Sequence, residues 1–151
     1  MNSWEECAIT KKYNWIIGTL IVLLVILVVG FWQQKSIEYK NLENLCQRSA
    51  SMALENFSNY MANGEDSDYI SGVADFRSFM NAYQALNDSS SNTEYIWCNS
   101  VYSDMLLHPE KVKSNIQGLI DALKHLAKDY DSPNGFNLIN VYSNELTYSD
   151  N

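Results

Sequence analysis

Polar and apolar residues are interspersed along most of this chain, but residues 15–32 form one uncharged run in which Thr19 is the only polar side chain. As a helix with a rise of about 1.5 Å per residue, this run covers roughly 27 Å, close to the ~30 Å hydrocarbon core of a bilayer. A core helix of a soluble protein would normally carry a polar face, and this run has none. Aromatic side chains flank it at both ends, as in the interfacial belts of membrane helices: Tyr13, Trp15, Phe31 and Trp32. The pattern predicts a transmembrane helix.

A cleaved signal peptide is the alternative for this run, because the basic residues Lys11 and Lys12 directly precede it. The run is long for a signal peptide, and it closes with the bulky Phe31 and Trp32. We therefore expect an uncleaved signal anchor. The two lysines next to the span favour a short cytoplasmic tail of residues 1–14 and an extracytoplasmic C-terminal part, although basic residues soon after the span make the positive-inside count nearly even.

Beyond the span, apolar residues recur three or four positions apart, which is the spacing of one face of an α-helix. This spacing predicts four helices: one over residues 36–62, a second after the acidic residues 65–68, a third over about 93–107 and a fourth over about 109–130. The acids at 65–68 suit the N-terminus of the second helix, whose apolar residues run from Tyr69 to Leu86. The first helix is able to continue from the span. Asn63-Gly64 offers it a left-handed end, and Pro109 suits the first position of the last helix, with His108 in the cap or turn.

Four amphipathic helices with short connections favour an antiparallel bundle. The predicted fold class is therefore all-α, with one N-terminal transmembrane helix followed by a small antiparallel four-helix-type bundle over residues 33–135. The last helix has the clearest apolar stripe, and it predicts these core residues: Val112, Ile116, Leu119, Ile120, Leu123, Leu126 and Tyr130.

The C-terminal segment, residues 136–151, differs from the rest. Pro133 and Asn134-Gly135 predict a turn before it, and its apolar residues fit neither the helical nor the strand period well. They are too numerous for a purely disordered tail. We expect the segment to pack on the bundle or to become ordered on a partner.

The charge of the chain narrows the classes of partner. The net charge is −8 and the pI is near 4.6. Glu5 and Glu6 balance Lys11 and Lys12 in the tail, so the whole net charge belongs to the residues after the span. An acidic domain repels nucleic acid and anionic lipid headgroups. We expect no nucleic-acid partner; the expected partners are the lipid bilayer, through the span, and another protein.

Two cysteines fall on predicted core faces, Cys46 in the first helix after the span and Cys98 in the third. In an oxidising extracytoplasmic compartment these two could form a disulfide. The alternative is a pair of free buried thiols, because sharing a core does not bring two Cα atoms within bonding reach. Cys7 lies in the tail, and the absence of a Cys-x-x-Cys pair argues against thiol redox catalysis and a zinc ribbon.

The sequence holds no motif for catalysis, cofactor binding or metal binding. His125 follows Asp121 by four residues, a spacing that suits two metal ligands, but no further His or Cys is placed to complete a site. The acidic run from Asp129 lacks the glycine and glutamate that an EF-hand loop requires. Neither a Gly-x-Ser-x-Gly elbow nor a glycine-rich phosphate loop occurs. We therefore expect a non-enzymatic protein with no catalytic residues, cofactor or metal.

The third predicted helix is apolar on two sides. One face carries Tyr95, Cys98, Tyr102 and Met105. Opposite it lies a second set, here called the outer row, with spacings of four, three and four: Ile96, Ser100, Ser103 and Leu107. One interpretation is a central helix with neighbours all round. The other is an exposed stripe on which a partner helix docks, with the small serines allowing close approach.

These features favour a single-pass, membrane-anchored helical protein that acts as an interaction, scaffold or accessory component of a membrane complex. An extracytoplasmic ligand-sensing helical bundle is the alternative, and the short predicted tail of residues 1–14 counts against it because a receptor needs a route for its signal. A membrane-tethered hydrolase ranks third, since the sequence shows no catalytic motif.

Overall fold

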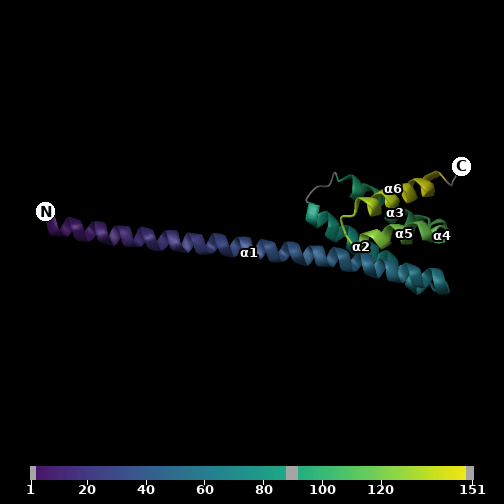
Figure 1. The fold of residues 1–151 in the computed structure, drawn as a ribbon, viewed down its shortest axis with the longest axis horizontal. Helices are drawn as coiled ribbons and strands as arrows, with labels where there is room; N and C mark the ends of the chain where they lie inside the picture. Colours follow the sequence, from purple (N-terminus) through teal and green to yellow (C-terminus); the bar gives the residue numbers. More distant parts are fainter. Residues whose placement is uncertain (1–2, 88–91, 149–151) are drawn as a thin grey trace. The chain divides into compact units, whose positions relative to one another are not determined.

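The computed structural model of the chain describes residues 3–87 and 92–148, with side chains described over residues 15–87 and 92–147. This part of the chain is all-helical and contains no strand, so the predicted all-α class is confirmed. The chain divides into two compact units, of which the first ends at Tyr39 and the second begins at Lys40. The helices are α1 (Ser3–Asn63), α2 (Asp66–Asn87), α3 (Thr93–Leu107), α4 (Pro109–Ser114), α5 (Ile116–Leu126) and α6 (Pro133–Tyr148) (Figure 1).

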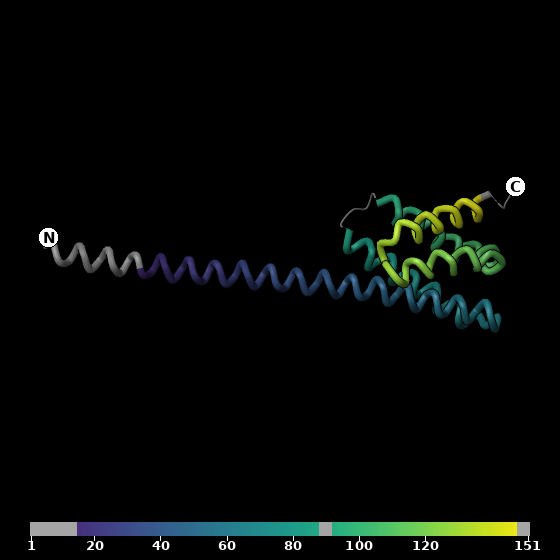
Figure 2. Tube along the Cα trace, in the orientation of Figure 1, coloured from purple at the N-terminus to yellow at the C-terminus, as the bar shows by residue number. Residues whose placement is uncertain are grey.

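The first unit contains the N-terminal part of α1, whose residues 15–32 are all exposed. The mean hydropathy of an 18-residue window in this helix reaches 2.8, and none of that window is buried by the chain. Figure 2 shows this stretch as an unbroken helical trace from residue 15 onward. The core helix of a soluble domain would instead be covered by its neighbours. The described chain therefore has one helix that is long and apolar enough to cross a membrane.

The second unit has one hydrophobic core, to which each of its helices contributes. α1 supplies four buried apolar residues spaced three or four apart: Cys46, Ala50, Ala53 and Phe57. The helix ends where the sequence predicts, because Gly64 has a φ of +74° and its N–H donates to the carbonyl of Tyr60 at 2.7 Å. Glycine adopts this left-handed conformation without the strain that a Cβ would cause.

α2 begins after this turn and places aromatic rings in the core. Asp66 and Asp68 lie in its first turn, where negative charge is favourable, as the sequence predicts. Further along α2, the Phe79 ring stacks on those of Tyr83 and Phe136, with centroid distances of 6.0 and 6.3 Å. Phe136 belongs to α6, so rings from the middle and the end of the chain share the centre of the core.

The helix predicted over residues 109–130 is broken into α4 and α5. The break is at Asn115, whose φ of −118° and ψ of 19° are not helical. The Ser114 hydroxyl and the side-chain amide of Asn115 both donate to the backbone carbonyl of Lys111, at 2.9 and 3.0 Å. In a continuous helix this carbonyl would accept from the backbone N–H of Asn115, so the two side chains compete with the helical hydrogen bond. Most of the predicted stripe is nevertheless buried: Val112, Ile116, Leu119, Ile120, Leu123 and Leu126. Tyr130 is half-buried.

Residues 133–148 form helix α6, although residues 136–148 fit no period well, and the turn predicted at residues 133–135 is wrong because the helix begins there. Its buried residues are Phe136, Ile139, Tyr142, Ser143 and Leu146. α6 packs against α5 and α3 (Figure 1). The approach to α5 is close, because a Cβ on Gly135 would lie 2.7 Å from Cγ of Leu126. The segment is thus part of the same core as the helices that precede it.

Candidate functional site: the outer face of α3

The outer row lies opposite the face that α3 buries. Val101 and Met105 point into the core with at most 2% of their surface exposed. Ile96 and Leu107, at the two ends of the row, are 55% and 72% exposed. Leu106, beside Leu107, is also exposed. α3 therefore presents large apolar side chains to solvent at both ends of the row.

The two serines in the middle of the row are half-buried and hydrogen-bonded. The hydroxyl of Ser143 in α6 donates to the hydroxyl oxygen of Ser100 at 3.0 Å. Ser103 donates to the carbonyl of Asn99 in its own helix at 2.8 Å. Ser100 thus lies beside α6, and only part of the row is open. Each hydroxyl group thus has one hydrogen-bond partner, so an apolar group that covers the serines leaves neither of them without a hydrogen bond.

Asp104 is the charged side chain of α3 beside the outer row. α3 also carries Glu94 and contains no Lys or Arg, but Glu94 acts on the core residues Cys98 and Tyr83 and so belongs to the opposite face. Asp104 is half-buried and makes no ion pair within the part of the chain that the structure describes. The face therefore combines exposed apolar side chains with one carboxylate.

Cys46 and Cys98 are both buried in the core as free thiols in this structure. Cys46 is a weak donor to the carbonyl of Phe79, with a sulfur–oxygen distance of 3.7 Å. Burial, with a smaller effect of the Asp131 charge, raises the pKa of Cys46 to about 12. Burial also raises the pKa of Cys98, and the nearby Cys46 adds to that shift. The disulfide between them stays a prediction, and Cys7 lies outside the residues whose side chains are described.

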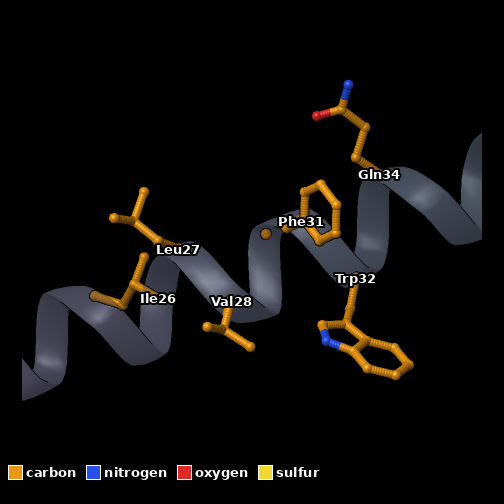
Figure 3. A pocket seen from close by; sticks show the side chains of 7 residues that line it. Ile26, Leu27, Val28, Phe31, Trp32 and Gln34 are labelled. Carbon is orange, nitrogen blue, oxygen red and sulfur yellow. The ribbon is translucent and has the colours of Figure 1, made fainter.

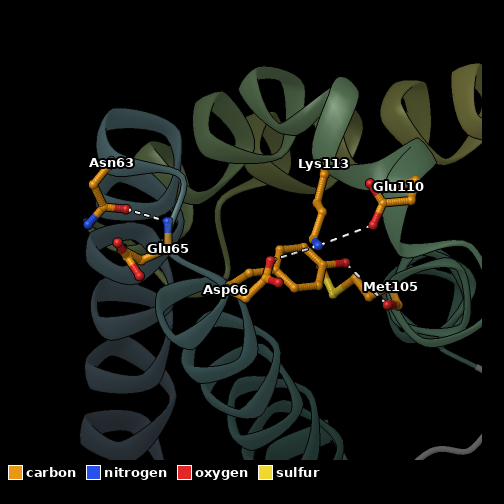
Figure 4. A network of polar contacts seen from close by, with 7 residues as sticks. Asn63, Glu65, Asp66, Met105, Glu110 and Lys113 are labelled. Atoms are coloured by element: carbon orange, nitrogen blue, oxygen red, sulfur yellow. Dashed lines mark hydrogen bonds and ion pairs between the residues drawn. The ribbon is translucent and has the colours of Figure 1, made fainter.

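A polar network that the sequence does not reveal links the start of α2 to α4 (Figure 4). The ammonium group of Lys113 lies 2.8 Å from Asp66 and 3.2 Å from Glu110. It also lies 5.2 Å from the ring centroid of Tyr69 and 5.8 Å from that of Tyr60. The hydrogen bond to Asp66, with a smaller one to Glu110, raises the pKa of Lys113. The lysine is 16% exposed and both carboxylates belong to this chain, so the network ties α2 to α4.

In the possible metal pair of Asp121 and His125, the carboxylate of Asp121 is occupied by other contacts. Asp121 accepts hydrogen bonds from Lys124 and Gln117, both at 2.8 Å. The bond from Lys124 is the main cause that holds the pKa of Asp121 below its usual value. In residues 15–87 and 92–147, no three His, Cys, Asp or Glu side chains are grouped to hold a metal ion.

A surface hollow on α1 is lined by a single stretch of helix: Ile26, Leu27, Val28, Gly30, Phe31, Trp32 and Gln34. In Figure 3 the labelled side chains project outward from one helix, and no second element faces them. Gaps of this kind between the side chains of a bare helix suit the acyl chains of lipids. We therefore assign the hollow to the apolar span and not to a ligand site.

No protein-family model, no curated protein and no solved structure matches this chain. Among the exposed apolar side chains of the described residues, we take two surfaces as the features that point to function. They are the span of residues 15–32 and the ends of the outer row at Ile96 and Leu107.

Proposed function

We propose that this protein is a single-pass, membrane-anchored helical interaction protein, which serves as a scaffold or accessory component of a membrane complex and is not an enzyme. The observation that carries the proposal is the exposure of Ile96 and Leu107 on α3. Covering apolar surface is favourable by roughly 25 cal/mol per Å², so a partner that covers these side chains gains binding energy.

The same proposal includes the topology. Residues 15–32 cross the bilayer as an uncleaved anchor, residues 1–14 lie in the cytoplasm, and the second unit lies outside. Lys11 and Lys12 support this orientation, because basic residues next to a span favour the cytoplasmic side. The helices of the second unit pack as antiparallel neighbours, an arrangement that their short connections support.

A ligand-sensing bundle, the other function that we considered, needs a pocket between its helices with a few polar groups that orient the ligand. The centre of this core is instead filled by the fully buried rings of Phe57, Phe76 and Phe79. The interaction function is therefore the better supported of the two.

The test is the mass of the complex that the full chain forms when it is extracted from native membranes in a mild detergent. We expect the wild type to co-purify with another protein, and Ile96→Glu or Leu107→Glu to release it while the melting temperature stays unchanged. Both side chains are exposed, so the new charge meets water unless a partner covers it. Ser100 is less suitable, because a bulky substitution there would also disturb its contact with Ser143.

Ile70→Glu is the matched control, because Ile70 lies on α2 and is 66% exposed. The proposal is wrong if the wild type behaves as a detergent-bound monomer without partners. It is also wrong if Ile70→Glu releases the partner as completely as the two variants in α3.

A further inference from the structure

The outer row has the spacing of a coiled-coil seam. Steps of four, three and four residues correspond to the alternating a and d positions of a heptad repeat. Ile96 and Ser103 then occupy d positions, while Ser100 and Leu107 occupy a positions. At about 1.5 Å per residue the seam is about 17 Å long, so its length suits a single partner helix.

The shape of the seam suits knobs from such a helix. Ile96 and Leu107 are exposed at the ends, and the small, half-buried side chains of Ser100 and Ser103 lie between them. The serine hydroxyls are already bonded to Ser143 and to the backbone. Apolar side chains of a partner can therefore cover the centre and leave each serine at least one hydrogen bond.

The residues that flank the seam carry a single charge. In heptad order the e positions are Trp97 and Asp104, and the g positions are Asn99 and Leu106. Charges at e and g positions select the partner of a coiled coil. Asp104 is the only charged group among the four, and it has no ion pair within the described residues.

This charge pattern discriminates between the possible occupants. A second copy of the chain would bring together two domains that each hold the net charge of −8, and like charges oppose association. An anionic lipid surface is disfavoured for the same reason. A helix with basic residues at its edges is complementary to the face.

We infer that the outer row binds one amphipathic helix of a different protein, with apolar side chains over Ser100 and Ser103 and a Lys or Arg beside Asp104. The inference rests on the proposed function and specifies the chemistry of its partner. It also assigns separate roles to the two parts of the face. The apolar ends supply contact area, and Asp104 selects the basic helix.

The first experiment is site-specific photo-crosslinking of the full chain in intact native membranes. A benzophenone amino acid replaces Leu107, and mass spectrometry identifies the segment that it captures. Ile70 on α2 is the matched control position because its exposure, 66%, is close to the 72% of Leu107. We expect Leu107, and not Ile70, to capture one segment with apolar residues three or four apart and a Lys or Arg within one helical turn of the crosslink.

The second experiment tests the charge of Asp104. The captured segment is synthesised as a peptide and titrated against the full chain in detergent micelles. Asp104→Lys should weaken its binding by about tenfold or more, and replacing the basic residue of the peptide by Glu should restore the affinity. Glu55→Lys, at an exposed position on α1, is the charge-matched control. Asp104→Asn removes the charge with a smaller change of side chain, in case Asp104→Lys disturbs the fold. The melting temperatures of both variants are measured beside the affinities.

The outcomes separate the inference from the proposed function. Capture of a second copy, or of a segment without a basic residue, overturns the inference but still shows docking on α3. Unchanged binding by Asp104→Lys and Asp104→Asn overturns it as well. If Leu107 captures no protein, or captures no more than Ile70 does, both the inference and the proposed function are wrong.

Discussion

An added Cβ at Gly72 would lie 2.7 Å from two ring carbons of Phe57, a side chain with no exposed surface. Since real Cβ atoms do not approach other atoms so closely, α1 and α2 pack at this point only because residue 72 has no side chain. This glycine therefore has a packing role, and its backbone is ordinary helix.

Gly72→Ala should lower the free energy of unfolding by about 1–2 kcal/mol. Alanine favours helix by up to about 1 kcal/mol over glycine, but overpacking a rigid core typically costs about 1–3 kcal/mol. Urea denaturation of the full chain in detergent, followed by near-ultraviolet circular dichroism, measures the difference. Ser71→Ala, at the exposed neighbouring position, should change stability by less than about 0.5 kcal/mol. A stabilised Gly72→Ala would show that Phe57 moves aside easily.

The two buried thiols make stability depend on pH in the reduced protein. The pKa of Cys46 rises from 9.0 to about 12 on folding, and that of Cys98 rises as well. Above pH 9 the unfolded chain loses thiol protons that the folded chain keeps. The stabilising effect is therefore complete below pH 9 and declines as pH rises toward the folded pKa.

We expect the free energy of unfolding to fall by roughly 1 kcal/mol per thiol between pH 9 and 10, with a smaller fall from Tyr69, Tyr83 and Tyr142, because burial raises the pKa of these side chains as well. Replacing Cys46 and Cys98 together by alanine should remove the larger part of this slope. Protein isolated without reductant should lack the same part of the slope if the two residues form the predicted disulfide. An equal slope in the double variant would mean that other groups cause it.

At the scale of the helix, α5 separates core from surface most clearly. Leu123 is fully buried, whereas the next residue, Lys124, is exposed and pairs with Asp121 at 2.8 Å. Leu123→Ala should cost about 2–5 kcal/mol, because it removes buried contacts and leaves a cavity. Lys124→Ala should cost less than about 1 kcal/mol, since exposed ion pairs contribute little. Chemical denaturation of both variants checks this, and similar small effects would show that the stripe is not the core.

The bounds of helices are predictable where local signals decide them. The sequence places the third helix at residues 93–107, and α3 has these limits. Asn92 accepts a hydrogen bond from the backbone N–H of Glu94 at 2.9 Å, and Pro109 follows the helix, so both ends are set by nearby residues. The Asn63-Gly64 end of α1 is predictable for the same reason.

Other features depend on contacts between distant residues, and the sequence does not predict them. α6 is rich in asparagine, a poor helix former, and is held by burial against α3 and α5. Lys113 meets Asp66 across 47 positions, and Ser143 meets Ser100 across 43. In the candidate site, the spacing of the outer row was visible in the sequence. The partial cover that α6 gives to Ser100 was not.

For the whole molecule, the orientation of the anchor decides which compartment receives the second unit. In a variant without native cysteines, Glu55→Cys places one thiol at an exposed site on α1 in the second unit. Lys11 and Lys12 before the span predict that a membrane-impermeant maleimide labels this thiol in intact cells. Labelling that appears only after lysis would reverse the topology and remove the oxidising setting that the disulfide requires.

The position of α6 in the core has a consequence for biosynthesis. Among the described helices the ribosome makes α6 last, yet Ile139 and Leu146 are needed to close the core against α3 and α5. The nascent chain is therefore tethered at its N-terminus, by the proposed anchor, before its domain is able to fold. Until residues 133–148 emerge, the faces that α6 covers stay open to chaperones and proteases. A chain that terminates early within α5 would reach the membrane as an unfinished domain and be a target for quality-control degradation.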